Sequence, residues 1–140
     1  MTTNAISSVG ASFKRGDGSS NESFAAIAEI NSITGPSKSR DTIDVTSLDS
    51  TGGYKEFKAS FRDPGEVTLN MNYSRDGYNT LNDDFESDTS KNYQIVMPDT
   101  GNTTYDFAGY VTAIPITIPL IDKVTMDVTI KITGQITMSS

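Results

Sequence analysis

Two stretches of alternating side chains, separated by a long connection, constrain the fold of this chain more than any other feature. They occupy residues 42–47 (TIDVTS) and 66–73 (EVTLNMNY), where apolar and polar residues alternate with period two. Such alternation is typical of β-strands with one buried and one solvated face. We therefore expect the apolar side chains of both stretches to point into a core. They are Ile43 and Val45 in the first stretch, and Val67, Leu69, Met71 and Tyr73 in the second.

The connection between them, residues 48–65, is too long for a hairpin turn and too apolar for a solvated loop. Connections above about 12–15 residues are usually functional or disordered. Basic residues gather in its second half, and Gly52-Gly53 gives it a flexible point. We predict a projecting arm that contacts another subunit; the alternative is an arm folded over its own sheet. The residues expected to make the contacts are Leu48, Tyr54, Lys55, Phe57, Lys58, Phe61 and Arg62.

The rest of the chain is predicted to be mostly β. Residues 24–30, 92–98, 104–111 and 123–133 alternate like strands. Residues 1–13 are predicted to be a flexible start that leads into a short strand, followed by a loop over residues 14–23. Pro115 and Pro119 indicate an edge, a bend or a crossing between sheets, because proline donates no ladder hydrogen bond. The predicted fold is an antiparallel β-sandwich or barrel section with the arm (about residues 48–65) and one flanking helix (about residues 75–88).

That helix is predicted from its cap and its apolar spacing. Ser74 suits the N-cap, and Tyr78, Leu81 and Phe85 share one face. An acidic cluster is expected on the opposite face, and its position near the helix C-terminus, where the dipole disfavours acids, indicates a basic partner. This possible docking face consists of Asp83, Asp84, Glu86 and Asp88. The cluster lacks the spacing of a calcium-binding loop, so a solvated face is the alternative.

Composition excludes several classes of function. The chain has no cysteine and no histidine, so it has no disulfide, no thiolate metal site and no usual general base. No phosphate-binding or dinucleotide-binding motif is present. We therefore expect no catalytic residue, metal or cofactor. A net charge of −7 argues against tight wrapping of DNA. No signal peptide or membrane-spanning run is seen, and 140 residues favour a single domain.

The organising stretch also carries a resemblance to a known family. The segments RDTIDVTSLDSTGGYKEF and PGEVTL resemble the major tail tube proteins of siphophages, the phages with long non-contractile tails. The likeness continues through the helix, NYQIVMPD, FAGYVTAI and the closing strand, and covers roughly residues 24–137. It implies a β-sandwich that assembles into hexameric rings, which stack into the tube of the virion tail. Some members carry an additional immunoglobulin-like domain, which we do not expect in a chain that stops at Ser140.

The resemblance also implies how the subunits work together. Strands of each subunit join into an inner barrel, the arm reaches the neighbouring ring, and DNA leaves the head through the lumen without specific binding. The expected partners are further copies of the chain, the tail tip and tail terminator proteins, and a tape measure protein in the lumen, with no membrane. Assembly is expected in the bacterial host cytoplasm.

The lumen of such a tube is typically acidic, and the polar faces of the long strands are expected to line it. The candidates are Asp44, Glu66, Thr68, Asn70, Asn72 and Asp127. Lys123 and Lys131 share the face of Asp127, which conflicts with a uniformly acidic lining unless they pair with acids or lie at ring junctions. We expect the basic residues of the arm to meet residues 83–88 or Asp106 of a neighbour.

Two other classes remain open at this point. A tail-completion or head–tail connector protein would form a single ring instead of a stack. A β-sandwich binding module would be a monomer with surface aromatics, for which Tyr54, Phe57 and Tyr78 are available. An enzyme is disfavoured by the missing histidine and cysteine.

Overall fold

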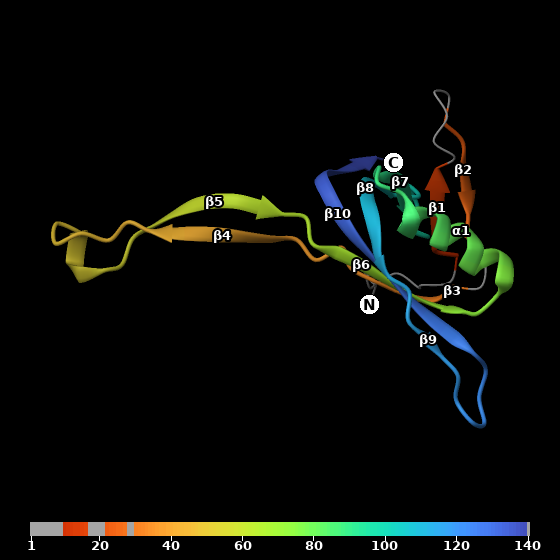
Figure 1. Ribbon diagram of the computed structural model, residues 1–140. Coiled ribbons are helices and arrows are strands. Elements are labelled where there is room, and N and C mark those ends of the chain that lie inside the picture. Colours follow the sequence, from red (N-terminus) through yellow and green to blue (C-terminus); the bar gives the residue numbers. More distant parts are fainter. Residues whose placement is uncertain (1–9, 17–21, 28–29, 140) are drawn as a thin grey trace, which may run out of the picture.

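The computed structural model describes residues 10–16, 22–27 and 30–139, and it is built mainly from antiparallel strands around one helix (Figure 1). The helix α1 is Arg75–Glu86, and the 3-10 turn η1 is Thr51–Gly53. The strands are β1 (Ser12–Gly16), β2 (Phe24–Ala26), β3 (Ile30–Thr34), β4 (Ser39–Asp44), β5 (Phe57–Asp63), β6 (Glu66–Asn72), β7 (Lys91–Val96), β8 (Thr104–Ala113), β9 (Ile116–Thr117) and β10 (Thr125–Ser139).

The larger sheet has the order β2-β1-β7-β8-β10-β6-β3, and β9 also pairs with β10. All of its pairs are antiparallel. The long strand β10 pairs with β6 along its first half and with β8 along its second half, with a register shift at Thr129/Ile130. One strand therefore belongs to both halves of the sheet and lets it fold around a core. The mostly β, antiparallel class with one helix is as predicted.

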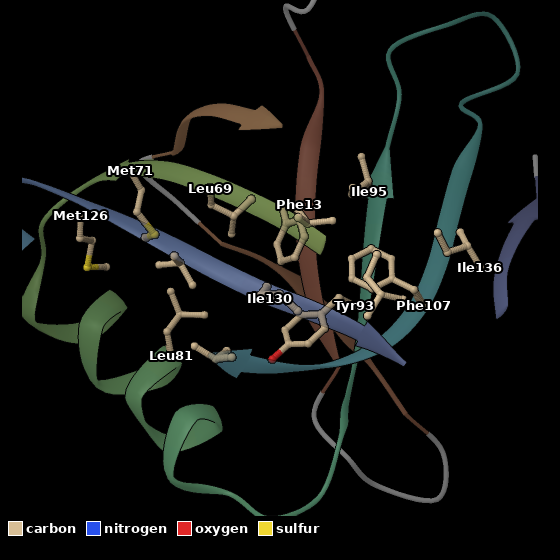
Figure 2. Close-up of a cluster of buried hydrophobic side chains, with 14 residues drawn as sticks. Phe13, Leu69, Met71, Leu81, Tyr93, Ile95, Phe107, Met126, Ile130 and Ile136 are labelled. Carbon is tan, nitrogen blue, oxygen red and sulfur yellow. The ribbon is translucent and has the colours of Figure 1, made fainter. Parts of the chain in front are cut away.

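The core lies between the two halves of this sheet (Figure 2). Alternate residues of β6 and β10 face it, because the side chains of a strand alternate between its two faces. An aromatic cluster fills the other half, where the Phe13 and Tyr93 ring centroids lie 5.5 Å apart. Leu81 of α1 closes the core from the side of the helix. The fully buried members of β6 and β10 are Val67, Leu69, Met71, Met126, Val128 and Ile130.

Helix α1 begins where the sequence predicts. Ser74 has an extended backbone, and its hydroxyl oxygen accepts a hydrogen bond from Gly77 N at 3.1 Å. This cap satisfies one of the amides that the first helical turn leaves without a partner. Asp76 in the first turn suits the positive end of the helix dipole.

The first organising strand differs from its prediction. β4 pairs only with β5, in a separate two-stranded sheet that projects far from the body (Figure 1). Ile43 is 54% exposed and Val45 is also exposed, so the expectation that they point into the core was wrong. The same expectation was wrong for Tyr73, which follows β6 and is exposed as well. The arm is therefore longer than residues 48–65: it is a β-ribbon that begins at Ser39. Alternation indicates a strand with two unlike faces, but it does not tell which molecule covers the apolar face.

Several strand boundaries also differ. Residues 24–30 form parts of two strands, β2 and β3, with residues 28–29 outside the described part. Lys14 to Gly16 continue β1 instead of opening a loop, and residues 1–9 of the predicted flexible start lie outside the described residues. β10 extends to Ser139, well past the predicted end.

Candidate assembly surfaces

One outer face of the sheet is polar across β9, β10, β6 and β3, and we call it the polar wall. Along β6 the buried residues alternate with outward ones, and the same holds for the first half of β10. The register places the outward residues opposite one another in four pairs. These pairs are Glu66 with Lys131, Thr68 with Thr129, Asn70 with Asp127, and Asn72 with Thr125.

Side-chain hydrogen bonds link three strands of the polar wall. Asn70 Nδ2 donates to Asp127 Oδ1 at 2.7 Å. Asn31 Nδ2 donates to Asn70 Oδ1 at 3.1 Å and to Asn72 Oδ1 at 3.0 Å, while Lys123 Nζ donates to Asn31 Oδ1 at 3.5 Å. A polar network of this kind fixes the side chains relative to one another, so this part of the wall is hydrophilic and ordered.

The polar wall contains all of the expected lumen residues except Asp44. Asp44 lies in β4 of the ribbon, where its Oδ1 accepts from Thr46 N at 2.9 Å. Hydrogen bonds from the side chain and the backbone of Thr46 lower the pKa of this carboxyl. The structure therefore separates Asp44 from the other five candidates.

Lys131 does not present a free positive charge on the wall. Its Nζ lies 3.3 Å from Asp63 Oδ1, at the base of the arm. The Gly65 backbone N–H donates to the same oxygen at 2.8 Å, and this bond, followed by Lys131, lowers the pKa of Asp63. Asp63 thus neutralises Lys131 and ties the arm to the end of the polar wall.

Both lateral edges of the polar wall lack a strand partner within the described part of the chain. β3 ends the strand order on one side, and β9 pairs only with β10 on the other. Since β9, β10, β6 and β3 are successively antiparallel, β9 and β3 run in opposite directions. A free edge presents unpaired backbone groups that another strand is able to pair with, so both edges are open to such pairing.

The arm exposes most of its apolar side chains. All residues of β4 are exposed, and in β5 only Ser60 is partly covered. Phe61 is 89% exposed, and Leu48, Tyr54 and Phe57 are exposed as well. The alternative that the arm folds over its own sheet is therefore wrong for this subunit. Lys55, Lys58 and Arg62 are exposed too, and none makes an ion pair with another described residue.

The far end of the arm is nevertheless ordered by local hydrogen bonds. Val45 N donates to Glu56 O at 2.9 Å, and Glu56 N donates to Thr46 Oγ1 at 2.8 Å. The Ser50 hydroxyl bridges the loop by accepting from Ser47 N and donating to Glu56 Oε2. The end thus has a defined shape, with the apolar side chains facing outward.

The acidic face of α1 is smaller than predicted. Asp83, Glu86 and Asp88 are exposed, but Asp84 is only 2% exposed, so its assignment to the docking face was wrong. Arg15 Nε and Nη2 donate to the two Asp84 oxygens at 2.7 and 2.6 Å. The Tyr93 hydroxyl donates to Asp84 Oδ2 at 2.7 Å.

This buried cluster of Asp84, Arg15 and Tyr93 attaches α1 to β1 and β7. Hydrogen bonding to Asp84 raises the pKa of Arg15, and burial followed by the Asp84 bond raises the pKa of Tyr93. The carboxylate takes the inward position next to Leu81, so Phe85 is turned out and is 44% exposed. Phe85 belongs to the predicted apolar stripe with Tyr78 and Leu81, but the structure leaves it exposed. The sequence around residue 84 does not predict that Asp84 pairs with Arg15, because Arg15 lies 69 positions away.

Asp106 is a second acid that the sequence analysis named for the arm. It lies in β8, and its Oδ1 is a buried oxygen with no hydrogen-bond partner among the described residues. An unsatisfied buried oxygen costs free energy, so Asp106 lowers the stability of this part of β8.

Other kinds of site are not found in the described ranges. No group of three or more acidic side chains there could hold a metal ion, and no helix there is long and apolar enough to cross a membrane. An outward arm, a polar wall and two free sheet edges are instead the features of a structural subunit that assembles with copies of itself.

The sequence matches the family model described as "Lambda phage tail tube protein, TTP" over residues 7–139. The chain therefore belongs to this family of structural tail tube proteins, as the resemblance implied. A comparison with curated protein sequences finds no significant match.

Solved structures of phage-like tails share the fold. A protein from the tail of an empty gene transfer agent particle with C6 symmetry is 20% identical, with a TM-score of 0.76 over 92% of this chain and 95% of that chain. A chain of the PVC sheath/tube terminator of an extracellular contractile injection system is 14% identical, with a TM-score of 0.73 over 100% of both chains. The SPP1 tail tube protein is 7% identical, with a TM-score of 0.62 over 93% of this chain and 76% of that chain.

Proposed function

We propose that six copies of this chain close into a ring through the edges of the polar wall, and that the rings stack into a tail tube. The free edges carry the proposal. A rotation about the tube axis brings β9 of one subunit beside β3 of the next, and the opposite directions of these strands allow antiparallel pairing. Closure into a barrel removes both exposed edges at once.

In this assembly the polar wall faces the lumen, where the hydrogen-bonded Asn31, Asn70 and Asp127 form a hydrophilic lining. Of the two lysines on this face, Lys131 is paired with Asp63, while Lys123 donates to Asn31 and keeps its charge, so the surface offers few positive charges to DNA phosphates. DNA therefore passes through without specific binding on its way into the host. The tape measure protein occupies the lumen before ejection.

The arm connects one ring to the next. Its exposed apolar residues are buried against the neighbouring ring. Lys55 and Lys58 form ion pairs there with the exposed acids Asp83 and Glu86 of α1. The charges of the two surfaces are complementary, which steers the approach and selects the register. The tail tip and tail terminator proteins bind the two ends of the stack. The subunits assemble in the bacterial cytoplasm, before the tail joins the virion.

Electron microscopy of the purified chain, with sedimentation as a check, tests this function. We expect hollow tubes with regular striation. Single rings that never stack would favour a connector protein, and a chain that stays monomeric when seeded with preformed tail fragments would contradict the proposal.

Charge reversal tests the arm contact. The double variant Lys55→Glu/Lys58→Glu is expected to prevent stacking, and adding Asp83→Lys/Glu86→Lys in the same chain is expected to restore it. The control is Lys55→Glu/Lys58→Glu with Asp106→Lys. If only the control restored stacking, the arm would contact Asp106 instead of Asp83 and Glu86.

A further inference from the structure

The turn between β9 and β10 presents a second exposed apolar surface, which we call the apolar tip (residues 118–121). Leu120 is 99% exposed, and Ile118 and Ile121 are nearly as open to solvent. The tip projects beyond the body at the end of the β9–β10 hairpin, away from the arm (Figure 1). Several adjacent aliphatic side chains left in water mark an interaction surface.

A groove of about 1170 Å³ lies where the arm leaves the body, and we call it the elbow groove. One side is the ribbon from its base outward, with the exposed side chains of Phe61 and, farther along β4, Ile43. The other side is the second half of β10 at Gly134 to Ile136. Basic side chains line it as well, namely Lys38, Arg40 and Arg62. The groove thus combines an apolar lining with positive charge.

The apolar tip and the elbow groove lie at opposite ends of the same strands. Glu66 of β6, directly after the arm, pairs with Lys131, while Asn72 at the other end pairs with Thr125. Thr125 also pairs with Thr117, the residue before the tip. Six residue steps separate these ends, which is about 20 Å at a strand rise of about 3.3 Å. A second copy displaced along the strands therefore brings its tip to the elbow groove of the first.

We propose that the apolar tip of one subunit inserts into the elbow groove of a subunit in the adjacent ring, an inference that rests on the proposed function. Leu120 and Ile121 pack against Ile43 and Phe61, and Asp122 beside the tip faces the basic side chains of the groove. The contact joins two different surfaces of the same chain, so it repeats without closing. Such a contact extends a stack of rings without limit, which a contact between two identical surfaces does not.

Disulfide trapping tests the pairing, because the chain contains no cysteine. In assembled tubes, Leu120→Cys/Phe61→Cys is expected to give a ladder of many cross-linked subunits on a non-reducing gel after mild oxidation. The control pair is Phe85→Cys/Phe61→Cys. It tests for a contact between the elbow groove and the exposed position 85 of α1. A ladder from the control pair alone, or no ladder from either pair in well-formed tubes, overturns the proposal.

A second variant separates this inference from the proposed function. Leu120→Asp/Ile121→Asp is expected to fold normally and to accumulate single rings without tubes, and the matched control Leu120→Met keeps an apolar tip and forms tubes. Normal tubes from the Asp variant overturn the inference alone. A folded Asp variant that forms neither rings nor tubes also overturns it, because the tip would then lie between neighbours within a ring. Failure of the unmodified chain to assemble contradicts the proposed function instead.

Discussion

The body and the arm are built from the same kind of alternating strand, but the body buries its apolar side chains and the arm exposes them. In β6 of the body, Leu69 and Met71 are fully buried against β10 and α1. In β5 of the arm, Phe57 and Phe61 alternate just as regularly and remain exposed. The difference lies only in what covers the apolar face. The body is therefore stabilised by its own packing, whereas the apolar face of the arm stays uncovered in the single subunit.

The arm is consequently the weaker part of the isolated subunit. A two-stranded hairpin alone is at best marginally stable in water. The ribbon is held by its own ladder, by the hydrogen bonds at its far end and by Asp63 at its base. Exposed segments with few buried contacts open at low free-energy cost. Substitutions in the two regions should therefore act on different quantities.

The largest effect on stability is expected from Arg15→Ala. It leaves the fully buried Asp84 carboxylate without its charge partner, which costs about 3–5 kcal/mol in the free energy of unfolding. The matched control is Arg62→Ala on the exposed arm, with a change within about 0.5 kcal/mol. Urea unfolding of the unassembled subunit measures both. Equal effects of the two substitutions would mean that the buried cluster does not support the body.

Truncation of one apolar residue in each region sharpens the contrast. Leu69→Ala opens a cavity in the core and is expected to cost about 3 kcal/mol of unfolding free energy. Phe61→Ala removes an exposed ring and is expected to change that quantity by less than about 0.5 kcal/mol, while it weakens tube formation. The same urea titration, paired with sedimentation of the assembled protein, checks this. A destabilising Phe61→Ala would show that the arm belongs to the subunit's own core.

The double variant Tyr54→Ser/Phe57→Ser is expected to affect assembly alone. Both side chains are exposed, so the free energy of unfolding should stay within about 0.5 kcal/mol of that of the unmodified subunit. Polymerisation should be lost, because the replacement removes apolar surface that the neighbouring ring would cover. Sedimentation measures polymerisation. Urea unfolding followed by circular dichroism measures the stability of the fold. Tubes of normal length from this variant would contradict the role of the arm.

The smallest effect is a pH dependence at the base of the arm. The pKa of Asp63 is lowered in the folded state, so its contacts stabilise the fold above the ordinary carboxyl pKa of about 4. They are lost as the pH falls through the lowered value, because the unfolded chain binds the proton first. An NMR titration of Asp63 in the non-polymerising variant measures the shift, and Asp63→Asn should abolish the pH dependence at this site. An Asp63 pKa at or above its ordinary value would contradict the contact with Gly65 and Lys131.

Features with a local cause could be predicted from the sequence. Ser74 caps α1 through an amide three residues away, and the buried faces of β6 and β10 follow from strict alternation. The class of fold, the single helix and the presence of an arm follow from such patterns.

Features that depend on distant partners could not be predicted in this way. Asp84 is buried because Arg15 and Tyr93 lie opposite it and bind its carboxylate. The helical pattern alone would instead predict burial of the neighbouring Phe85. The ribbon could have been predicted, because the apolar residues Phe57, Ala59 and Phe61 alternate as in a strand. That strand pairs with residues 39–44. Asn31, which bonds to Asn70, lies at an irregularity in β3 between Ile30 and Ser32. Residue patterns do not reveal such an irregularity.

The central claim is that the body is complete within one subunit and the arm is completed by another copy. Hydrogen exchange of the same amides in freshly diluted subunits and in assembled tubes tests it most directly. We expect β6 and β10 to be protected in both states, and β4 and β5 to exchange quickly in the free subunit and become strongly protected in the tube. Equal protection of the arm in the two states would contradict the claim.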